Sequence, residues 1–244
     1  MMAEIKRMKN WNKWIFGGLG WAIGGPIGGI LGFALGSITE ESQKTYKEGR
    51  PVLANDFSAV LLVLCAAVMK ADQRVMRSEL DFVKNYFFRQ FGEAHTRERM
   101  QLFREILKQD IPLAQVCQQV RQHLDPASRL QLLHLLFGLA SSDGAVGAPE
   151  LTVLGQISSL IGIGQKDFES IKAMFIKDTE SAYKILEIDR TATDEEVKKA
   201  YRKMAVKFHP DKVHHLGPEF QEDAQEKFKK INEAHEAIRK ERGL

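Results

Sequence analysis

The sequence predicts an all-α protein in three parts: an apolar N-terminal helix, a bundle of helices and a C-terminal helical hairpin. Three observations support this prediction. Residues 14–38 carry no charged side chain, apolar residues within 52–177 recur at spacings of three and four, and two amphipathic stretches follow residue 193. A half-buried strand would alternate apolar and polar residues instead, and residues 52–177 sustain no such alternation.

The composition limits the class of protein. The 244-residue chain is 44% hydrophobic and 27% charged with a net charge of +3, which excludes wholesale disorder and a strongly basic nucleic-acid binder. Its two cysteines, Cys65 and Cys117, lie in apolar stretches and form no CxxC pair. This pattern argues against a disulfide framework, a zinc ribbon and a thioredoxin-like site, and we expect two buried thiols.

The apolar segment at residues 14–38 follows a basic tail at residues 1–13. Its 25 residues exceed the roughly 20 that a helix needs to cross a bilayer, so we expect a single span. A hairpin that turns at residues 24–26 and a cleaved signal peptide are the alternatives. Glycines at intervals of four predict a ridge without side chains through which two copies dimerise in the membrane. The glycines of this ridge are Gly20, Gly24, Gly28, Gly32 and Gly36.

A polar linker at residues 39–51 leads to a predicted bundle of about seven helices at residues 52–177. Prolines mark expected helix starts at Pro112, Pro126 and Pro149. Leu61-Leu62-Val63-Leu64 corresponds to Leu132-Leu133-His134-Leu135 in an internal repeat with an offset of 71 residues. We expect His134, which lies among leucines, to be a core residue with hydrogen-bond partners rather than a metal ligand.

Each copy of the repeat contains an aspartate followed seven positions later by a glutamate. The four residues are Asp72, Glu79, Asp143 and Glu150. Such side chains cap helices by accepting backbone N–H bonds and by complementing the helix dipole. Brought together, four carboxylates would also suit a hard divalent cation such as Ca²⁺ or Mg²⁺. Both interpretations are open, and no other cofactor is expected.

The strongest motif is His209-Pro210-Asp211, between two amphipathic helices. Thr193 and Glu196 form a capping box that places the start of the first helix at Asp194. One face of this helix is apolar, and the other carries a basic strip composed of Lys198, Lys199, Arg202, Lys203 and Lys207. A second apolar stripe runs from Phe220 to Ile238, so the tripeptide should lie at the tip of a helical hairpin.

These segments resemble known families. Ala182-Tyr183-Lys184-Ile185-Leu186, His209-Pro210-Asp211-Lys212 and Lys227-Phe228-Lys229-Lys230-Ile231-Asn232-Glu233-Ala234 resemble a DnaJ-type J-domain at residues 181–244. The turns Ala71-Asp72-Gln73 and Ser142-Asp143-Gly144 resemble those of the TerB fold, although the first copy lacks the glycine. Two residues depart from the J-domain pattern: Glu187 replaces a glycine and His235 replaces a tyrosine. The order of the parts is similar to that of membrane-anchored J-domain co-chaperones.

The resemblance implies a co-chaperone rather than an enzyme. Such a protein stimulates ATP hydrolysis by a DnaK-type chaperone through His209, Pro210, Asp211 and the basic strip. Because that partner is cytoplasmic, we expect a single-pass protein of the bacterial inner membrane with both domains in the cytoplasm. The alternative is a metal-binding TerB-like stress-response or interaction protein with an accessory J-domain.

Rival functions lack support in the sequence. HExxH, Gly-x-Ser-x-Gly and GxxxxGK[ST] motifs are absent, which argues against the corresponding enzymes. Residues 181–244 hold 14 Lys and Arg against 13 Asp and Glu, a balance that argues against nucleic-acid binding.

Overall fold

The computed structural model describes residues 2–38, 57–217 and 220–243, and the linker predicted at residues 39–51 lies outside them. The described residues form helices and turns with no strand among them, which confirms the all-α prediction. The chain divides into two compact units, Met1–His123 and Leu124–Leu244, and each is described by itself.

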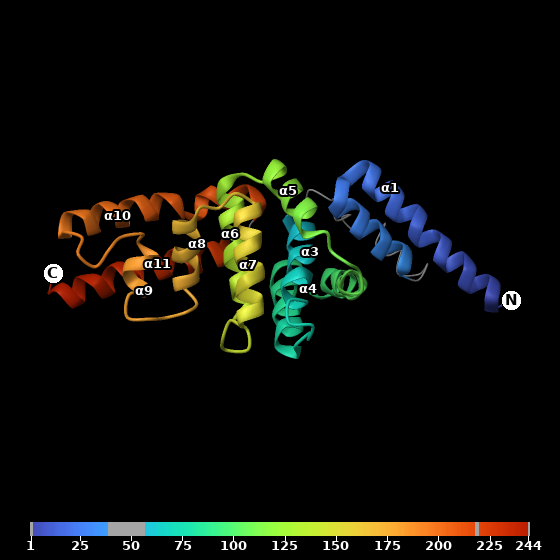
Figure 1. Cartoon of the computed structure of the whole chain (residues 1–244), viewed down its shortest axis with the longest axis horizontal. Helices are drawn as coiled ribbons and strands as arrows, with labels where there is room; N and C mark the ends of the chain where they lie inside the picture. Colours follow the sequence, from blue (N-terminus) through green and yellow to red (C-terminus); the bar gives the residue numbers. More distant parts are fainter. Residues whose placement is uncertain (1, 39–56, 218–219, 244) are drawn as a thin grey trace. The chain divides into compact units, whose positions relative to one another are not determined.

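The first helix, α1 (Met2–Ser37), bends back on itself at Gly25, and its two halves lie side by side (Figure 1). Gly25 has a φ of 62°, which suits glycine, and the following Pro26 has no N–H to continue the helical ladder. A Cβ on Gly20 would overlap the carbonyl oxygen of Gly28, and one on Gly32 would overlap that of Phe16. The glycines therefore permit close packing between the two halves of α1 within one chain.

This bend follows the hairpin alternative and not the straight span. Among the described residues one apolar helix, Trp14–Ser37, is long enough at 24 residues to cross a membrane. Folded at Gly25, each half has about a dozen apolar residues and measures roughly 18 Å, against a hydrocarbon core of roughly 30 Å. The segment therefore reaches a spanning length only when the bend opens.

The rest of the first unit covers the second half of α1. Its helices are α3 (Phe57–Met69), α4 (Arg77–Leu107) and α5 (Leu113–His123). Ile27, Leu31 and Ala34 are buried against them. The Gln119 side chain of α5 binds both sides of the bend: its Nε2 donates to the Gly24 carbonyl at 2.8 Å, and its Oε1 accepts from the Ile27 N–H at 3.0 Å. These two bonds satisfy backbone groups that the broken helix leaves unpaired.

The second unit begins with three helices: α6 (Pro126–Ala140), α7 (Ala148–Leu160) and α8 (Gln165–Ala173). Because α4 is broken at Gly92, where φ is 73°, the described part of the bundle from α3 to α8 contains seven helical segments, as the sequence predicts. Pro126 lies in the first turn of α6 and Pro149 in that of α7. Proline is tolerated there because N–H groups in the first turn of a helix have no acceptor within the helix, so the missing N–H of proline costs no hydrogen bond.

The C-terminal elements are α9 (Ser181–Ile185), α10 (Asp194–Lys207), the 3₁₀ helix η1 (Pro210–Leu216) and α11 (Gln221–Arg242) (Figure 1). The Thr193–Glu196 capping box is present and α10 begins at Asp194, so both predictions are confirmed. Helices α10 and α11 pack together as a hairpin. The Tyr201 ring stacks on His235 with ring centroids 4.1 Å apart, so histidine supplies the flat ring expected of a tyrosine there.

Candidate functional site

His209, Pro210 and Asp211 lie where α10 ends and η1 begins, at the tip of the hairpin. Pro210 occupies the first turn of η1, and His209 Nδ1 accepts from the Asp211 N–H at 3.3 Å. The His209 ring packs edge-on against Phe228 of α11 at 5.7 Å. The Asp211 side chain is 87% exposed, so the tip presents a carboxylate to solvent. The contact between His209 and Phe228 holds the loop that carries it.

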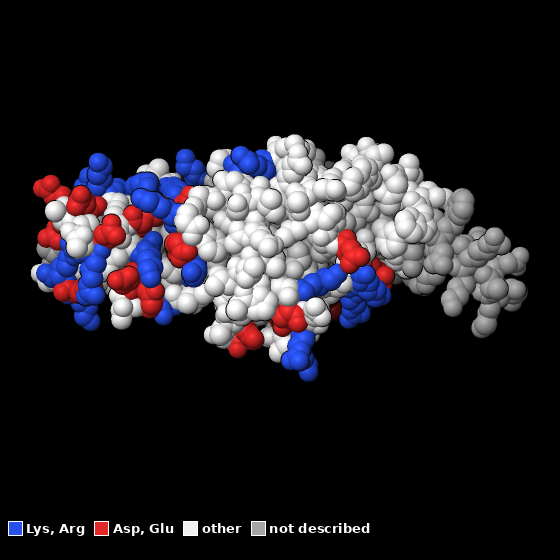
Figure 2. Space-filling model, viewed as in Figure 1, with Lys and Arg blue, Asp and Glu red and all other residues white. Residues whose placement is uncertain are grey.

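The basic strip divides into two parts. Lys198, Lys199 and Arg202 are exposed, and Figure 2 shows basic side chains interspersed with acidic ones over this end of the second unit. Lys203 and Lys207 converge on Glu187, at 2.7 Å and 2.8 Å from its carboxylate oxygens, and their side chains are 64% and 25% exposed. Lys207 also pairs with a carboxylate of α8, which belongs to Asp167. A partner can therefore meet Lys198, Lys199, Arg202 and Lys203, whereas Lys207 is largely covered by its contacts within the chain.

The contacts of Glu187 account for a glutamate at a position where the J-domain pattern has glycine. It has a φ of 59°, in the left-handed region that favours glycine, and its side chain is only 3% exposed. Burial opposes ionisation, but the hydrogen bonds from Lys203 and Lys207 outweigh it and lower the pKa of Glu187 to about 2. The ion pairs thus compensate for a backbone conformation that costs about 1–3 kcal/mol outside glycine.

Helix α6 contacts the loop that follows the tripeptide. His215 Nε2 lies 2.9 Å from Asp125 Oδ2 and 3.1 Å from Ser128 Oγ. Asp125 is also the N-cap of α6, where it accepts from the backbone N–H groups of Ala127 and Ser128. Partial burial opposes ionisation of Asp125, but the bonds from Ser128 outweigh it and lower its pKa.

Helix α6 also contacts α11 through buried polar side chains. Lys227 Nζ donates to Gln131 Oε1 at 2.7 Å. His134 is buried beside Phe175, with ring centroids 4.9 Å apart. Neither His134 ring nitrogen has a hydrogen-bond partner in the described part of the chain, so it is a core residue as expected but lacks the expected hydrogen bonds. Its burial, with Lys227 and Lys230 nearby, lowers its pKa well below the usual value.

The four carboxylates of the repeat have local backbone partners. Glu79 accepts from the Met76 N–H and Glu150 from the Gly147 N–H, both at 2.7 Å. Asp72 and Asp143 each accept from the N–H two residues ahead. Within residues 2–38, 57–217 and 220–243, no group of three or more His, Cys, Asp or Glu side chains could hold a metal ion. The geometry therefore favours the capping interpretation over the Ca²⁺ or Mg²⁺ site.

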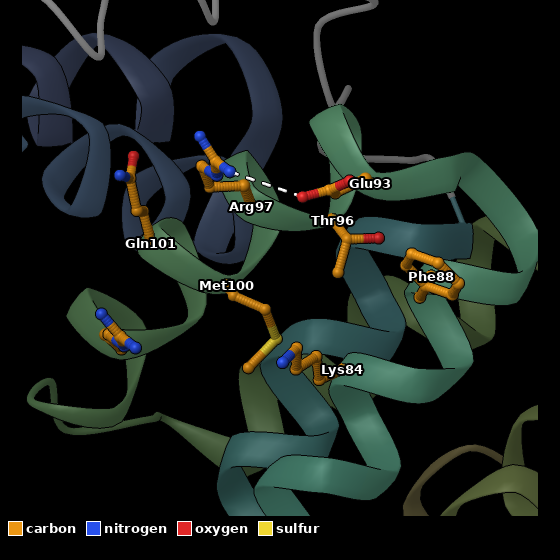
Figure 3. Close-up of a pocket in the computed structure, with 8 residues that line it drawn as sticks. Lys84, Phe88, Glu93, Thr96, Arg97, Met100 and Gln101 are labelled. Atoms are coloured by element: carbon orange, nitrogen blue, oxygen red, sulfur yellow. Dashed lines mark ion pairs between the residues drawn. The ribbon is translucent and has the colours of Figure 1, made fainter.

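Two other features carry no predicted site residue. Cys65 and Cys117 are buried, and burial raises the pKa of both thiols, as their apolar surroundings lead one to expect. The broken helix α4 encloses a pocket of about 400 Å³ (Figure 3). Phe88 and Met100 give it an apolar wall, and Arg97 pairs with Glu93 at 3.5 Å along its rim.

Sequence reasoning missed the residues that brace the tripeptide loop from outside the hairpin. Asp125 had one readable signal, since an aspartate directly before a helix-initiating proline is a typical N-cap. Its contact with His215, and that of Asp167 with Lys207, join residues 90 and 40 positions apart. No local pattern in the sequence marks such pairs.

Two family models match the chain and confirm both domain resemblances. The model described as tellurite resistance protein TerB matches residues 58–173, and the DnaJ domain model matches residues 181–242. Helices α6 to α8 of the second unit thus lie in the TerB match, and α9 to α11 in the DnaJ match.

Curated relatives named co-chaperone protein DjlA match over most of the chain. The co-chaperone protein DjlA of Shewanella oneidensis is 31% identical over 196 residues, covering 72% of this chain and 74% of that protein. The co-chaperone protein DjlA of Coxiella burnetii is 27% identical over 260 residues, covering 93% of this chain and 96% of that protein. The chaperone protein DnaJ of Thermoplasma acidophilum is 57% identical over 56 residues, which cover 23% of this chain and 14% of that protein. No solved structure matches the chain.

Proposed function

The chain belongs to the DjlA family of J-domain co-chaperones, and from this membership we propose that it stimulates ATP hydrolysis by a DnaK-type chaperone. The observation that carries the proposal is the exposed carboxylate of Asp211 at the tip of the hairpin. In this role the chain supplies no catalytic group. The chemistry takes place in the nucleotide site of the partner, and the J-domain acts as its activator.

The proposed mechanism has two steps. The exposed Lys198, Lys199, Arg202 and Lys203 steer the J-domain toward an acidic surface of the chaperone, which makes association fast and sensitive to salt. His209, Pro210 and Asp211 then dock and favour the state of the chaperone that hydrolyses ATP. Such a shift requires contacts that differ between the two states of the partner. Asp211 supplies a charge-assisted hydrogen bond and Pro210 fixes the turn that presents it.

We further propose that residues 14–38 attach the chain to the bacterial inner membrane with both domains on the cytoplasmic side. Support comes from the apolar helix and from large side chains that it exposes in the structure, including Trp14, Trp21 and Ile23. A single-pass arrangement requires the bend at Gly25 to open. Dimerisation through the glycine ridge requires the same opening, because Gly20 and Gly32 pack within one chain.

Single-turnover ATP hydrolysis by a DnaK-type chaperone tests the activating role. The full chain in detergent micelles should accelerate hydrolysis, and Asp211→Asn should lower the stimulation by about tenfold or more, since a hydrogen bond to a charged group contributes about 1.5–3 kcal/mol. Asp189→Asn removes an exposed carboxylate outside the tripeptide and is the matched control. Equal effects of the two variants, or no stimulation by the unmutated chain, would refute the proposal.

A further inference from the structure

The loop that carries the tripeptide is held from both ends by helices of the TerB-matched region. We call residues 208–216 the tripeptide loop. On its N-terminal side, Lys207 pairs with Asp167 of α8 and with Glu187. On its C-terminal side, His215 meets Asp125 and the adjoining Ser128 of α6. Asp211 lies between the two contacts.

Hydrogen bonds within α6 hold the Asp125 carboxylate independently of the tripeptide loop. Its Oδ1 accepts from the N–H groups of Ala127 and Ser128 at 2.9 Å and 3.1 Å, while Oδ2 meets the imidazole of His215. The fully buried Ser128 also donates its hydroxyl to Oδ2. A carboxylate fixed by three bonds within α6 therefore receives the loop with little side-chain entropy left to lose.

These contacts leave the functional surface open. The Asp211 side chain is 87% exposed and that of His209 is 49% exposed, although both flanks of the loop are fixed. An inhibitory contact would cover the tripeptide. A contact that restrains the flanks while leaving the tip accessible favours one loop conformation before the partner arrives, and preorganisation of this kind strengthens binding.

We propose that Asp125 is a positioning residue for the J-domain: by holding His215, it keeps the tripeptide loop in the conformation that the chaperone binds. The second half of the TerB-like bundle is then a working part of the J-domain site. The inference rests on the proposed function and adds a residue from outside the DnaJ match to it.

The proposal predicts a specific kinetic pattern. When only a fraction of a protein is in its binding-competent conformation, the apparent dissociation constant rises by the inverse of that fraction, while a saturated complex behaves normally. Loss of the Asp125–His215 contact should therefore raise the co-chaperone concentration for half-maximal stimulation by about five- to tenfold. The maximal stimulated rate and the salt dependence should stay unchanged, because the tripeptide and the basic strip are intact.

The experiment uses the full chain in the single-turnover assay. Asp125→Ser keeps an N-cap residue on α6 but removes the carboxylate from His215. Asp143→Ser makes the same change in the turn of the second repeat copy, where the carboxylate accepts from the local backbone N–H of Ala145, and is the matched control. His215→Ala and the double variant complete a mutant cycle.

We expect Asp125→Ser and His215→Ala each to raise the half-maximal concentration, and the double variant to equal either single one. Equal behaviour of Asp125→Ser and Asp143→Ser would overturn the inference. So would multiplicative effects in the double variant, because Asp125 would then act without His215. Failure of the unmutated chain to stimulate would instead overturn the proposed function on which the inference rests, and so separates the two.

Discussion

Burial of Lys227 leads to a prediction about stability and pH. The residue is 2% exposed in α11, its Nζ donates to Gln131 Oε1 at 2.7 Å and lies 5.1 Å from the centre of the Phe208 ring. Burial lowers the pKa of Lys227 from 10.5 to about 7, and Asp223 offsets only part of this effect. Lys227→Met keeps an apolar stem of similar length and removes the amine.

The sign follows from proton binding in the two states. Lys227 loses its proton near pH 7 in the folded chain and near pH 10.5 in the unfolded chain, so between these values the unfolded chain binds one more proton. The free energy of unfolding therefore rises with pH by up to about 1.4 kcal/mol per pH unit from this one group. Between pH 7.5 and 9.5 the contribution reaches roughly 2–3 kcal/mol, and Lys227→Met lacks it.

Urea unfolding followed by helical circular dichroism, at pH 7.5, 8.5 and 9.5, measures this difference. The Lys227→Met variant should be more stable than the unmutated chain at pH 7.5, and the two should converge as the pH rises. Lys229→Met, which removes an exposed neighbouring lysine, should follow the unmutated chain. A constant stability difference between Lys227→Met and the unmutated chain at all three pH values would refute the reasoning, since Lys227 would then keep its proton in the fold.

Three further predictions concern turns and caps. Gln73 has a φ of 62° where the second copy of the repeat has Gly144, so Gln73→Gly should raise the free energy of unfolding by about 1 kcal/mol in urea titrations. Glu187→Ala should be less stable than Glu187→Gly by about 1 kcal/mol, because both variants lose the ion pairs and only alanine has a Cβ that is strained at this positive φ; equal stabilities would contradict the assigned strain. Glu150→Ala should cost about 1 kcal/mol through its lost cap, and millimolar Ca²⁺ or Mg²⁺ should leave the melting temperature of the unmutated chain unchanged; a rise with either ion would favour the metal site.

Features with a local cause could be predicted from the sequence. The capping box at Thr193 and Glu196 needs only residues within one turn, and it set the start of α10 correctly. The internal repeat of the sequence is also present in individual hydrogen bonds. Glu79 and Glu150 accept from N–H groups of residues that lie 71 positions apart. Gln73 and Gly144, which both have a positive φ, are separated by the same 71 positions. Such turns repeat because each is stabilised by its own few residues.

Features that depend on tertiary contacts could not be predicted in the same way. A helical wheel groups Lys207 with the other basic residues of α10, because it records direction around one axis only. The structure separates Lys207 from Lys198 and Arg202, since its end of the helix meets Asp167 of α8. The glycine spacing of residues 14–38 likewise predicts a surface for close helix packing but does not say which helix fills it. The bend at Gly25 lets the same chain fill it.

The TerB-like region makes two sets of contacts, one in each compact unit. The first copy belongs to the unit that contains α1, where Gln119 binds the backbone on both sides of the bend. The second copy belongs to the unit that contains the J-domain helices, where Asp125 binds the tripeptide loop through His215. Gln119 and Asp125 lie only six positions apart in the sequence, on opposite sides of the boundary between the units. Each unit therefore contains one element, α1 or the tripeptide loop, that a side chain of this region binds.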